Sequence, residues 1–196
     1  MVIVGSDPKI VEQRLIAGKL ACPRCGSVLG RWGWARWRSL RCRGGSDERW
    51  RPRRARCRKC KATHVLWPGI LLPRRMYDPE VVGAAAAAKA AGAAHAQIAR
   101  QLGLARSTVR GWLDRLDRRA ERIRAHFTRW AYWLDPSLDA IDPRASPLGD
   151  ALAAVEIAAD AARRRLGPQP AVWAFAAAAT GGLLLANTSA PFPDPW

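Results

Sequence analysis

The chain has 196 residues, with 33 Lys and Arg against 16 Asp and Glu, and its formal net charge is +17. This length accommodates one or two small domains and excludes a large catalytic barrel, while a hydrophobic fraction of 49% excludes wholesale disorder. Residues 1–75 carry 19 basic and 4 acidic side chains, whereas residues 76–196 carry 14 and 12. The first part is therefore expected to face a polyanion.

The N-terminal segment predicts a short helix. It has no basic start and no long apolar stretch, which argues against a signal peptide. We therefore expect a cytoplasmic protein whose thiols stay reduced. Ser6-Asp7-Pro8 is typical of a capped helix start, apolar residues recur from Ile10 to Ile16, and Gly18 ends the pattern. Residues 19–68 are rich in Arg, Trp and Gly and contain short strand-like runs.

Four cysteines form two Cys-x2-Cys pairs in this region. Each pair places two thiolates on one side of a tight turn, and two such turns supply four sulfurs to one tetrahedral Zn²⁺. The 31-residue gap between the pairs is long, but the cost of closing a loop grows only with the logarithm of its length. The predicted ligands of a structural Zn²⁺ are Cys22, Cys25, Cys57 and Cys60.

Two other residues leave alternatives for this ligand set. Cys42 is unpaired and His64 lies four residues after Cys60, and either could replace one thiolate. Small core thiols and a redox-active pair are further interpretations of the same residues. We favour the set of four thiolates. Because four protein ligands leave no open position for water, the predicted site has no catalytic role.

The stretch between the cysteine pairs is strongly basic and rich in tryptophan. Residues 24–61 carry 14 basic and 2 acidic side chains, and Arg binds phosphate through two parallel hydrogen bonds. A solvated charged face is the alternative, and both interpretations allow Trp to fill the small core while Arg lies outside. The predicted phosphate contacts are Arg53, Arg54, Arg56, Arg58 and Lys59.

The segment 96–113 predicts a helix-turn-helix, for which the helix Pro79 to Ala91 would complete a three-helix unit. Ala99 is small enough for a second helix to cross closely, and Gly103 suits a left-handed turn. An ordinary helical hairpin with no role in DNA binding is the alternative. The buried side would consist of Ile98, Ala99, Leu102, Leu104, Val109, Trp112 or Leu113, and Leu116.

This arrangement leaves the N-terminal part of the second helix exposed, so that its side chains can enter the major groove. Arg can contact guanine there with two hydrogen bonds. His95, Gln97 and Thr108 are candidate phosphate contacts. Ala105 stands where a capping Ser is usual, which weakens the helix start by about 1 kcal/mol. The residues predicted to face the bases are Arg106, Ser107, Arg110, Gly111 and Asp114.

Apolar residues continue from Leu113 to Leu134 with alternating spacings of three and four, which predicts a long helix. A coiled-coil homodimer and packing against the chain's own C-terminal helices both explain the pattern, and we favour the second. Further helices are expected over 150–166 and about 171–186. The second of these is too short to span a membrane, which needs about 20 residues, so we expect no membrane partner.

The cysteine pairs with Thr63-His64-Val65, followed by Ile98-Ala99-x2-Leu102-Gly103 and Ser107-Thr108-Val109-x2-Trp112, resemble an uncharacterised actinobacterial family of zinc-ribbon plus helix-turn-helix proteins. They also resemble the N-terminal DNA-binding region of insertion-sequence transposases. The resemblance covers about residues 19–118 and implies DNA binding, with a recombinase or transposase as a partner. The transposase catalytic domain has no counterpart here, and neither a phosphate-binding Gly-rich loop nor a Gly-x-Ser-x-Gly turn is present.

The sequence as a whole predicts a mainly α protein with a small β zinc ribbon. An N-terminal helix and the ribbon occupy 1–75, a helix-turn-helix domain with a long C-terminal helix occupies 76–135, and C-terminal helices occupy 136–196. The expected function is sequence-specific, non-catalytic binding of double-stranded DNA in the nucleoid, by a transcriptional regulator or the DNA-recognition component of a mobile element. The alternatives are a zinc-ribbon RNA-binding protein and an adaptor that docks a partner enzyme through its C-terminal helices.

Overall fold

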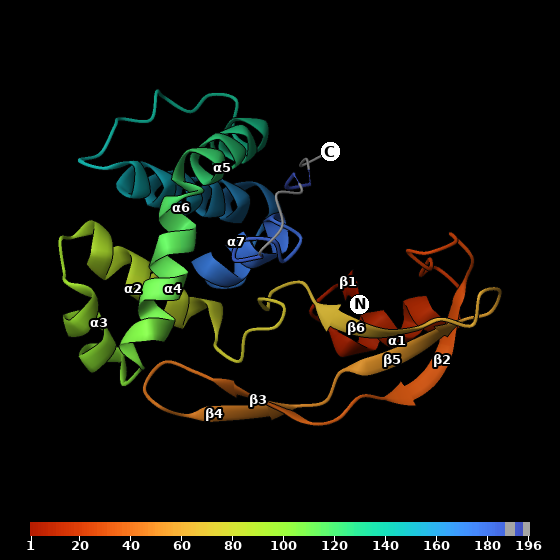
Figure 1. Ribbon diagram of the computed structural model, residues 1–196. Coiled ribbons are helices and arrows are strands. Elements are labelled where there is room, and N and C mark those ends of the chain that lie inside the picture. Colours follow the sequence, from red (N-terminus) through yellow and green to blue (C-terminus); the bar gives the residue numbers. More distant parts are fainter. Residues whose placement is uncertain (187–190, 194–196) are drawn as a thin grey trace.

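The computed structural model describes residues 1–186 and 191–193, which form a mixed α/β fold. A four-stranded sheet with one helix makes up the N-terminal part, and six further helices follow it. A two-stranded hairpin reaches from the sheet to the helices (Figure 1). A small β part followed by helices agrees with the order of elements that the sequence predicts.

The N-terminal sheet consists of four strands, β1 (Val2–Val4), β2 (Leu29–Trp34), β5 (Arg53–Cys57) and β6 (Thr63–Pro68). Their order is β1-β6-β5-β2, with β1 parallel to β6 and the other pairs antiparallel. Leu29, Ala55 and Leu66 are buried together with residues of helix α1, so one face of the sheet is covered by this helix.

Helix α1 (Pro8–Ile16) begins where the sequence predicts. The Asp7 side chain accepts a hydrogen bond from a backbone N–H of the first turn at 2.7 Å, and Pro8 occupies the first helical position. Val11 and Leu15 are buried against the sheet. Because these two residues are four apart, a single narrow stripe of the helix carries the packing.

Six helices follow the sheet: α2 (Pro79–Ala90), α3 (His95–Leu102), α4 (Arg106–Asp117), α5 (Ala120–Leu134), α6 (Pro147–Leu166) and α7 (Val172–Ala179). Helix α6 begins earlier than expected because Ser146 caps it, accepting a hydrogen bond from Gly149 N at 3.1 Å. Within the described part of the chain, no helix is long and apolar enough to cross a membrane.

The predicted extents of two helices are wrong. The long helix expected up to Leu134 is divided into α4 and α5 at Arg119, whose φ of −115° and ψ of 5° lie outside helical values. The last helix ends at Ala179 instead of continuing to about residue 186. The Thr180 hydroxyl there bonds back into the preceding turn, and the Gly181-Gly182 pair that follows has positive φ. A left-handed glycine pair cannot continue a right-handed helix.

One hydrophobic core joins the six helices. Helix α5 packs along α6, and the expected seam residues Ile123, Phe127 and Leu134 are buried inside the chain, while Trp130 is half-buried against the same core. These side chains are therefore not free to form the seam of a coiled-coil dimer. Buried residues on both sides of residue 135 belong to the same cluster, so the helices that follow residue 135 share a core with those that precede it.

Helices α2 and α7 come into close contact at Gly83. A Cβ atom added to Gly83 would lie 2.1 Å from the Trp173 ring, so only glycine allows this approach. The Glu80 carboxylate of α2 accepts hydrogen bonds from the backbone N–H groups of Trp173 and Ala174 at 2.8 and 3.2 Å. A negative charge at these unpaired N–H groups stabilises the N-terminus of α7.

A hairpin connects the sheet to the helices. Its strands are β3 (Arg38–Arg41) and β4 (Asp47–Trp50). Arg41 N donates to Met76 O at 2.9 Å, and Asp78 N donates to Arg41 O at 3.0 Å. Next to these bonds, the Tyr77 ring packs edge-on against Trp112 of α4 at 4.9 Å between centroids. The hairpin is thus fixed to the segment that leads into α2 and, through Tyr77, to α4.

Candidate metal centre and basic surface

The two cysteine pairs lie in similar turns at one end of the sheet. The first pair precedes β2 and the second begins at the last residue of β5, and these strands place Leu29 opposite Cys57. The residue after each pair has a left-handed conformation, with φ of 70° at Gly26 and 60° at Lys61. The antiparallel pairing of β2 and β5 therefore brings the two turns together across the 31 residues that separate them in sequence.

The four sulfur atoms of Cys22, Cys25, Cys57 and Cys60 all lie within 4.8 Å of one another. Cys22 Sγ is 3.7 Å from Cys60 Sγ, and Cys25 Sγ is 3.5 Å from Cys57 Sγ. Four sulfurs about 2.3 Å from a tetrahedral ion would be about 3.8 Å apart. All four are free thiols. The cluster has both the donor chemistry and the spacing to hold one metal ion.

Neighbouring groups shift the thiol pKa values of the second pair in opposite directions. Burial raises the pKa of Cys57, but hydrogen bonds from the Cys60 backbone N–H and the Cys25 thiol outweigh it and lower the pKa to about 6. The Ala62 backbone N–H lowers the pKa of Cys60, but burial and the adjacent thiols raise it to about 11. A bound cation removes this conflict because it stabilises every thiolate around it.

The two alternative ligands stand outside the cluster. His64 Nε2 is 3.4 Å from Cys22 Sγ, which places it as a hydrogen-bond neighbour of one sulfur. Burial lowers the pKa of His64, and the positive N-terminus adds to this effect. The Cys42 thiol lies in the turn of the hairpin and donates to Leu40 O at 3.6 Å. The structure therefore brings together the four thiols of the two pairs and leaves Cys42 apart.

Arg53, one of the predicted phosphate contacts, is engaged inside the protein. Its guanidinium donates to both carboxylate oxygens of Glu12, at 2.8 and 3.2 Å, and to Gly33 O at 2.7 Å, and its side chain is only 10% exposed. The hydrogen bond from Arg53, together with the charges of Arg53 and Arg31, lowers the pKa of Glu12 despite burial. Arg53 holds α1 on the sheet, and its low exposure leaves little of its guanidinium open to a ligand.

Replacing Glu12 with Gln is expected to destabilise the N-terminal part by about 1–3 kcal/mol, because charged hydrogen bonds to Arg53 and Arg31 are lost. Urea unfolding followed by far-ultraviolet circular dichroism measures the difference. The matched control is Arg14→Gln, an exposed change on the same helix, which should cost less than about 0.5 kcal/mol. Equal losses for the two variants would show that Glu12 does not anchor α1.

The other predicted phosphate contacts of the ribbon remain at its surface. Arg58 and Lys59 are exposed in the turn of the second cysteine pair. Arg54 and Arg56 are half-buried, and each donates to a neighbouring protein oxygen at 3.2 Å. These bonds hold the two guanidinium groups in place but do not neutralise them, because both acceptors are uncharged.

Three tryptophans are exposed, contrary to the expectation that Trp fills the ribbon core. The exposed fractions of Trp32, Trp34 and Trp37 are 48%, 52% and 56%. The Arg56 guanidinium lies 4.3 Å from the Trp32 ring centroid, the Arg53 guanidinium lies 4.8 Å from Trp34, and a third lies 5.5 Å from Trp37. The core of the sheet consists instead of aliphatic residues and two clustered cysteines.

In the segment 96–113 most of the apolar residues that were expected on the core side are buried, whereas Leu102 and Leu104 are only half-buried against the core. Gly103 ends α3 in a left-handed conformation, with φ of 62°. Ala105 begins α4 without a side-chain cap. The apolar residues on the core side are Ile98, Ala99, Val109, Trp112, Leu113 and Leu116. The exposed residues are Arg106, Ser107, Arg110 and Asp114 on α4 and Gln97 on α3, while His95, Thr108 and Gly111 are half-buried.

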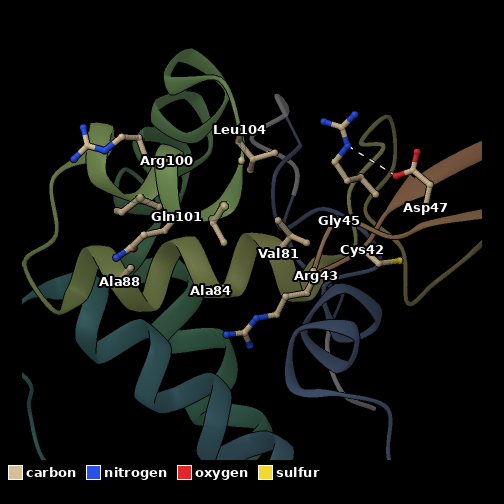
Figure 2. Close-up of a pocket in the computed structure, with 15 residues that line it drawn as sticks. Cys42, Arg43, Gly45, Asp47, Val81, Ala84, Ala88, Arg100, Gln101 and Leu104 are labelled. Carbon is tan, nitrogen blue, oxygen red and sulfur yellow. Dashed lines mark ion pairs between the residues drawn. The ribbon is translucent and has the colours of Figure 1, made fainter.

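A cleft of about 1040 Å³ separates the turn of the hairpin from α2 and α3. Figure 2 shows Arg43 of the hairpin reaching over α2 near Ala84, with Arg100 of α3 at the far rim of the cleft. Gly103 of the α3–α4 turn also lines it. Neither Arg43 nor Arg100 belongs to the contacts predicted from the sequence. Gly44 and Gly45 form the turn of the hairpin with positive φ, and nothing in the sequence shows where this turn lies.

A family model described as "Domain of unknown function (DUF6431)" matches residues 22–112 of the chain. The match begins at the first clustered cysteine and ends at Trp112 within α4. Comparison with curated proteins and with solved structures gave no match. The cysteine cluster, the hairpin and the exposed N-terminal part of α4 thus fall within a single matched segment, which excludes α5, α6 and α7.

Proposed function

We propose that the chain is a sequence-specific, double-stranded DNA-binding protein without catalytic activity, in which α3 and α4 form a helix-turn-helix. The observation that carries this proposal is the two-sided character of α4. Val109 and Trp112 are buried, whereas Arg106, Ser107 and Arg110 are exposed in its first two turns. N-terminal side chains of a helix placed in this way can reach base edges in the major groove.

We propose that the cluster of four cysteines holds a structural Zn²⁺. Sulfur donors favour Zn²⁺ over ions that prefer oxygen, and four protein ligands leave no position for a substrate. Cys22, Cys25, Cys57 and Cys60 would supply all of these ligands. The role of the ion in this proposal is to fix the two turns, and with them the basic residues Arg58 and Lys59.

Phosphate contacts in this proposal come from two groups of basic residues. One group lies on the ribbon, at Arg54, Arg56, Arg58 and Lys59. The other lies at the cleft beside the α3–α4 turn, where neither Arg43 nor Arg100 forms an ion pair with any other described residue. Unpaired guanidinium groups next to a helix that enters the groove are well placed to bind the DNA backbone.

The biological setting follows from the resemblance to zinc-ribbon plus helix-turn-helix proteins and to the DNA-binding region of insertion-sequence transposases. We propose a transcriptional regulator or the DNA-recognition component of a mobile element, associated with the nucleoid. A recombinase or transposase would be its partner in the second case. Co-purification of a recombinase or transposase with the tagged chain would favour the mobile element over the regulator.

Substitutions on α4 and on the ribbon are expected to affect DNA binding differently. After a binding site has been selected from random duplexes, Arg110→Ala should reduce discrimination at one base pair by about 1–3 kcal/mol. Arg58→Ala should weaken binding to all duplexes alike. It should also reduce the slope of log affinity against log salt concentration by about one, which corresponds to one phosphate contact. Fluorescence anisotropy over a range of salt concentrations measures both effects. If each variant loses affinity equally on selected and random DNA, the proposed division between residues that contact bases and residues that contact phosphates is wrong.

RNA binding by the ribbon is the second candidate function, because three exposed tryptophans offer surfaces on which unpaired bases stack. Competition between the selected duplex and a structured RNA of equal length separates the two candidates. Displacement of the duplex by RNA at equal or lower concentration would favour RNA as the natural ligand. Retention of the duplex at a large excess of RNA would favour DNA.

A further inference from the structure

A pocket of about 400 Å³ lies on the α1 side of the sheet, at the base of the β3–β4 hairpin. Trp34 and Trp50 line it, together with the apolar residues Val11 and Leu66. Its volume is at the lower end of the range of about 300–1,000 Å³ that is usual for small-molecule sites. The pocket can thus hold one flat ring system with its substituents, but not a peptide segment.

A β-bulge turns Trp34 towards this pocket. In a regular strand Trp32 and Trp34 would point to the same face, because side chains alternate with a period of two. The pairing of β2 with β5 shifts between Arg31 and Trp34, where Gly33 has a φ of 89°. As a result Trp34 stacks on Arg53, on the face that carries α1, while Trp32 stacks on Arg56. Bulges of this kind re-aim a side chain next to functional sites.

Charged side chains at the pocket supply both a hydrogen-bond acceptor and hydrogen-bond donors. A carboxylate has about four acceptor positions. Three of those on Glu12 are taken, two by Arg53 and one by Arg31, which leaves one for an N–H of a ligand. The Arg31 side chain is 62% exposed, and Arg51 is exposed beside it. The ligand that complements this site has an aromatic ring with an N–H donor and a negative charge next to it.

We propose that this pocket binds a single unpaired nucleobase, with the ring stacked on Trp34, an N–H of the base donated to Glu12, and the adjacent phosphate at Arg31 and Arg51. The inference rests on the proposed nucleic-acid binding and adds a second mode of recognition to it. The α3–α4 turn and the turn of the hairpin border one cleft, while the pocket lies at the other end of the hairpin. The chain would thus hold a duplex at one end and an extruded or single-stranded base at the other.

The experiment compares three versions of one short mixed-sequence duplex: fully paired, with one unpaired nucleotide, and with an unpaired abasic residue at the same place. The position of the unpaired nucleotide is moved along the duplex, and DNA and RNA versions are used. Fluorescence anisotropy gives the dissociation constants for the zinc-loaded full chain. The unpaired base should bind about tenfold tighter than the abasic residue at its best position, because stacking on an aromatic side chain supports such a gain.

Variants of the chain show whether the pocket causes the preference. Trp34→Ala should bring the ratio of base to abasic affinity to within about twofold, and Trp34→Phe should retain part of it. The matched control is Trp133→Ala, because Trp133 is also exposed and stacked by an arginine, Arg165, but lies on α5. Zinc content and thermal unfolding midpoint check that each variant is folded.

The outcomes separate this inference from the proposed function. Equal affinity for the base and the abasic residue would overturn the inference, and binding to the fully paired duplex would then still support the proposed function. A preference that Trp34→Ala and Trp133→Ala reduce alike would also overturn it. Absence of binding to every duplex would overturn both. A preference confined to the RNA series would confirm the pocket and identify RNA as the source of the base.

Discussion

Replacing Cys57 with Ser is expected to abolish tight metal binding and to unfold the four-stranded sheet. Among the described residues the core of the sheet has nine buried side chains, of which Cys22 and Cys57 are two, and Cys57 is 1% exposed. Metal binding contributes about 10–16 kcal/mol to folding in comparable structural zinc sites, which exceeds what so small a core supplies. Bound zinc per chain, measured with a chromogenic chelator, should fall from one to near zero. The near-ultraviolet circular dichroism of the tryptophans should weaken in parallel.

The fifth cysteine provides the matched control. Cys42→Ser removes a thiol from the same half of the chain, but Cys42 lies in the hairpin turn, outside the cluster. Its zinc content and its circular dichroism should stay at the values of the unaltered chain. Loss of zinc from Cys42→Ser, or full retention by Cys57→Ser, would show that the four-thiol ligand set is wrong.

The cysteine cluster could be predicted because its geometry depends on local spacing and on ligand chemistry. A separation of three residues fixes both sulfurs of a pair on one turn, and one ion requires both turns. The same holds for α4, where the positions of Val109 and Trp112 relative to Arg106 and Arg110 follow from the helical repeat. Both predictions concern residues whose relative positions are set within a few residues of the chain.

Features that depend on pairing between distant segments could not be predicted. Strand β1 has only three residues, and its partner β6 lies more than sixty residues away. The sequence contains a dense run of arginines, and nothing in it indicates that Arg53 is the one that meets Glu12. The face occupied by Trp34 depends on a bulge at Gly33, and a slip of one residue reverses the side of every residue beyond it.

The position of the hairpin could likewise not be predicted, although the hairpin links the sheet to the helices. Its turn could be inferred from Gly44-Gly45, but its place beside α3 depends on backbone hydrogen bonds to Met76 and Asp78. These bonds carry no side-chain signal in the sequence. As a consequence, the contribution of Arg43 to the proposed DNA surface became visible only in the structure.

Removing residues 136–196 is expected to unfold the helical part of the chain and to lower its affinity for duplex DNA by at least about 100-fold. The truncation exposes the buried face of α5, including Ile123, Phe127 and Leu134, and removes the residues of α7 that pack on α2. Each large side chain contributes about 1.5–3 kcal/mol by burial, so the summed loss approaches the total stability of about 5–15 kcal/mol for a typical domain. Thermal unfolding of the truncated chain should therefore lose its cooperative transition.

A single substitution in the core of the full chain distinguishes disruption of the core from loss of a partner-binding site. Phe127→Ala in the full chain should cost about 3–5 kcal/mol, because Phe127 is fully buried between α5 and its neighbours. Trp133→Ala, on the exposed side of the same helix, should cost clearly less. If Phe127→Ala and the truncation both leave cooperative unfolding and DNA affinity intact, the C-terminal helices are separable, as the adaptor alternative requires. If both variants lose cooperative unfolding and DNA affinity, and the loss grows with the buried surface removed, the C-terminal helices complete the core on which α4 packs.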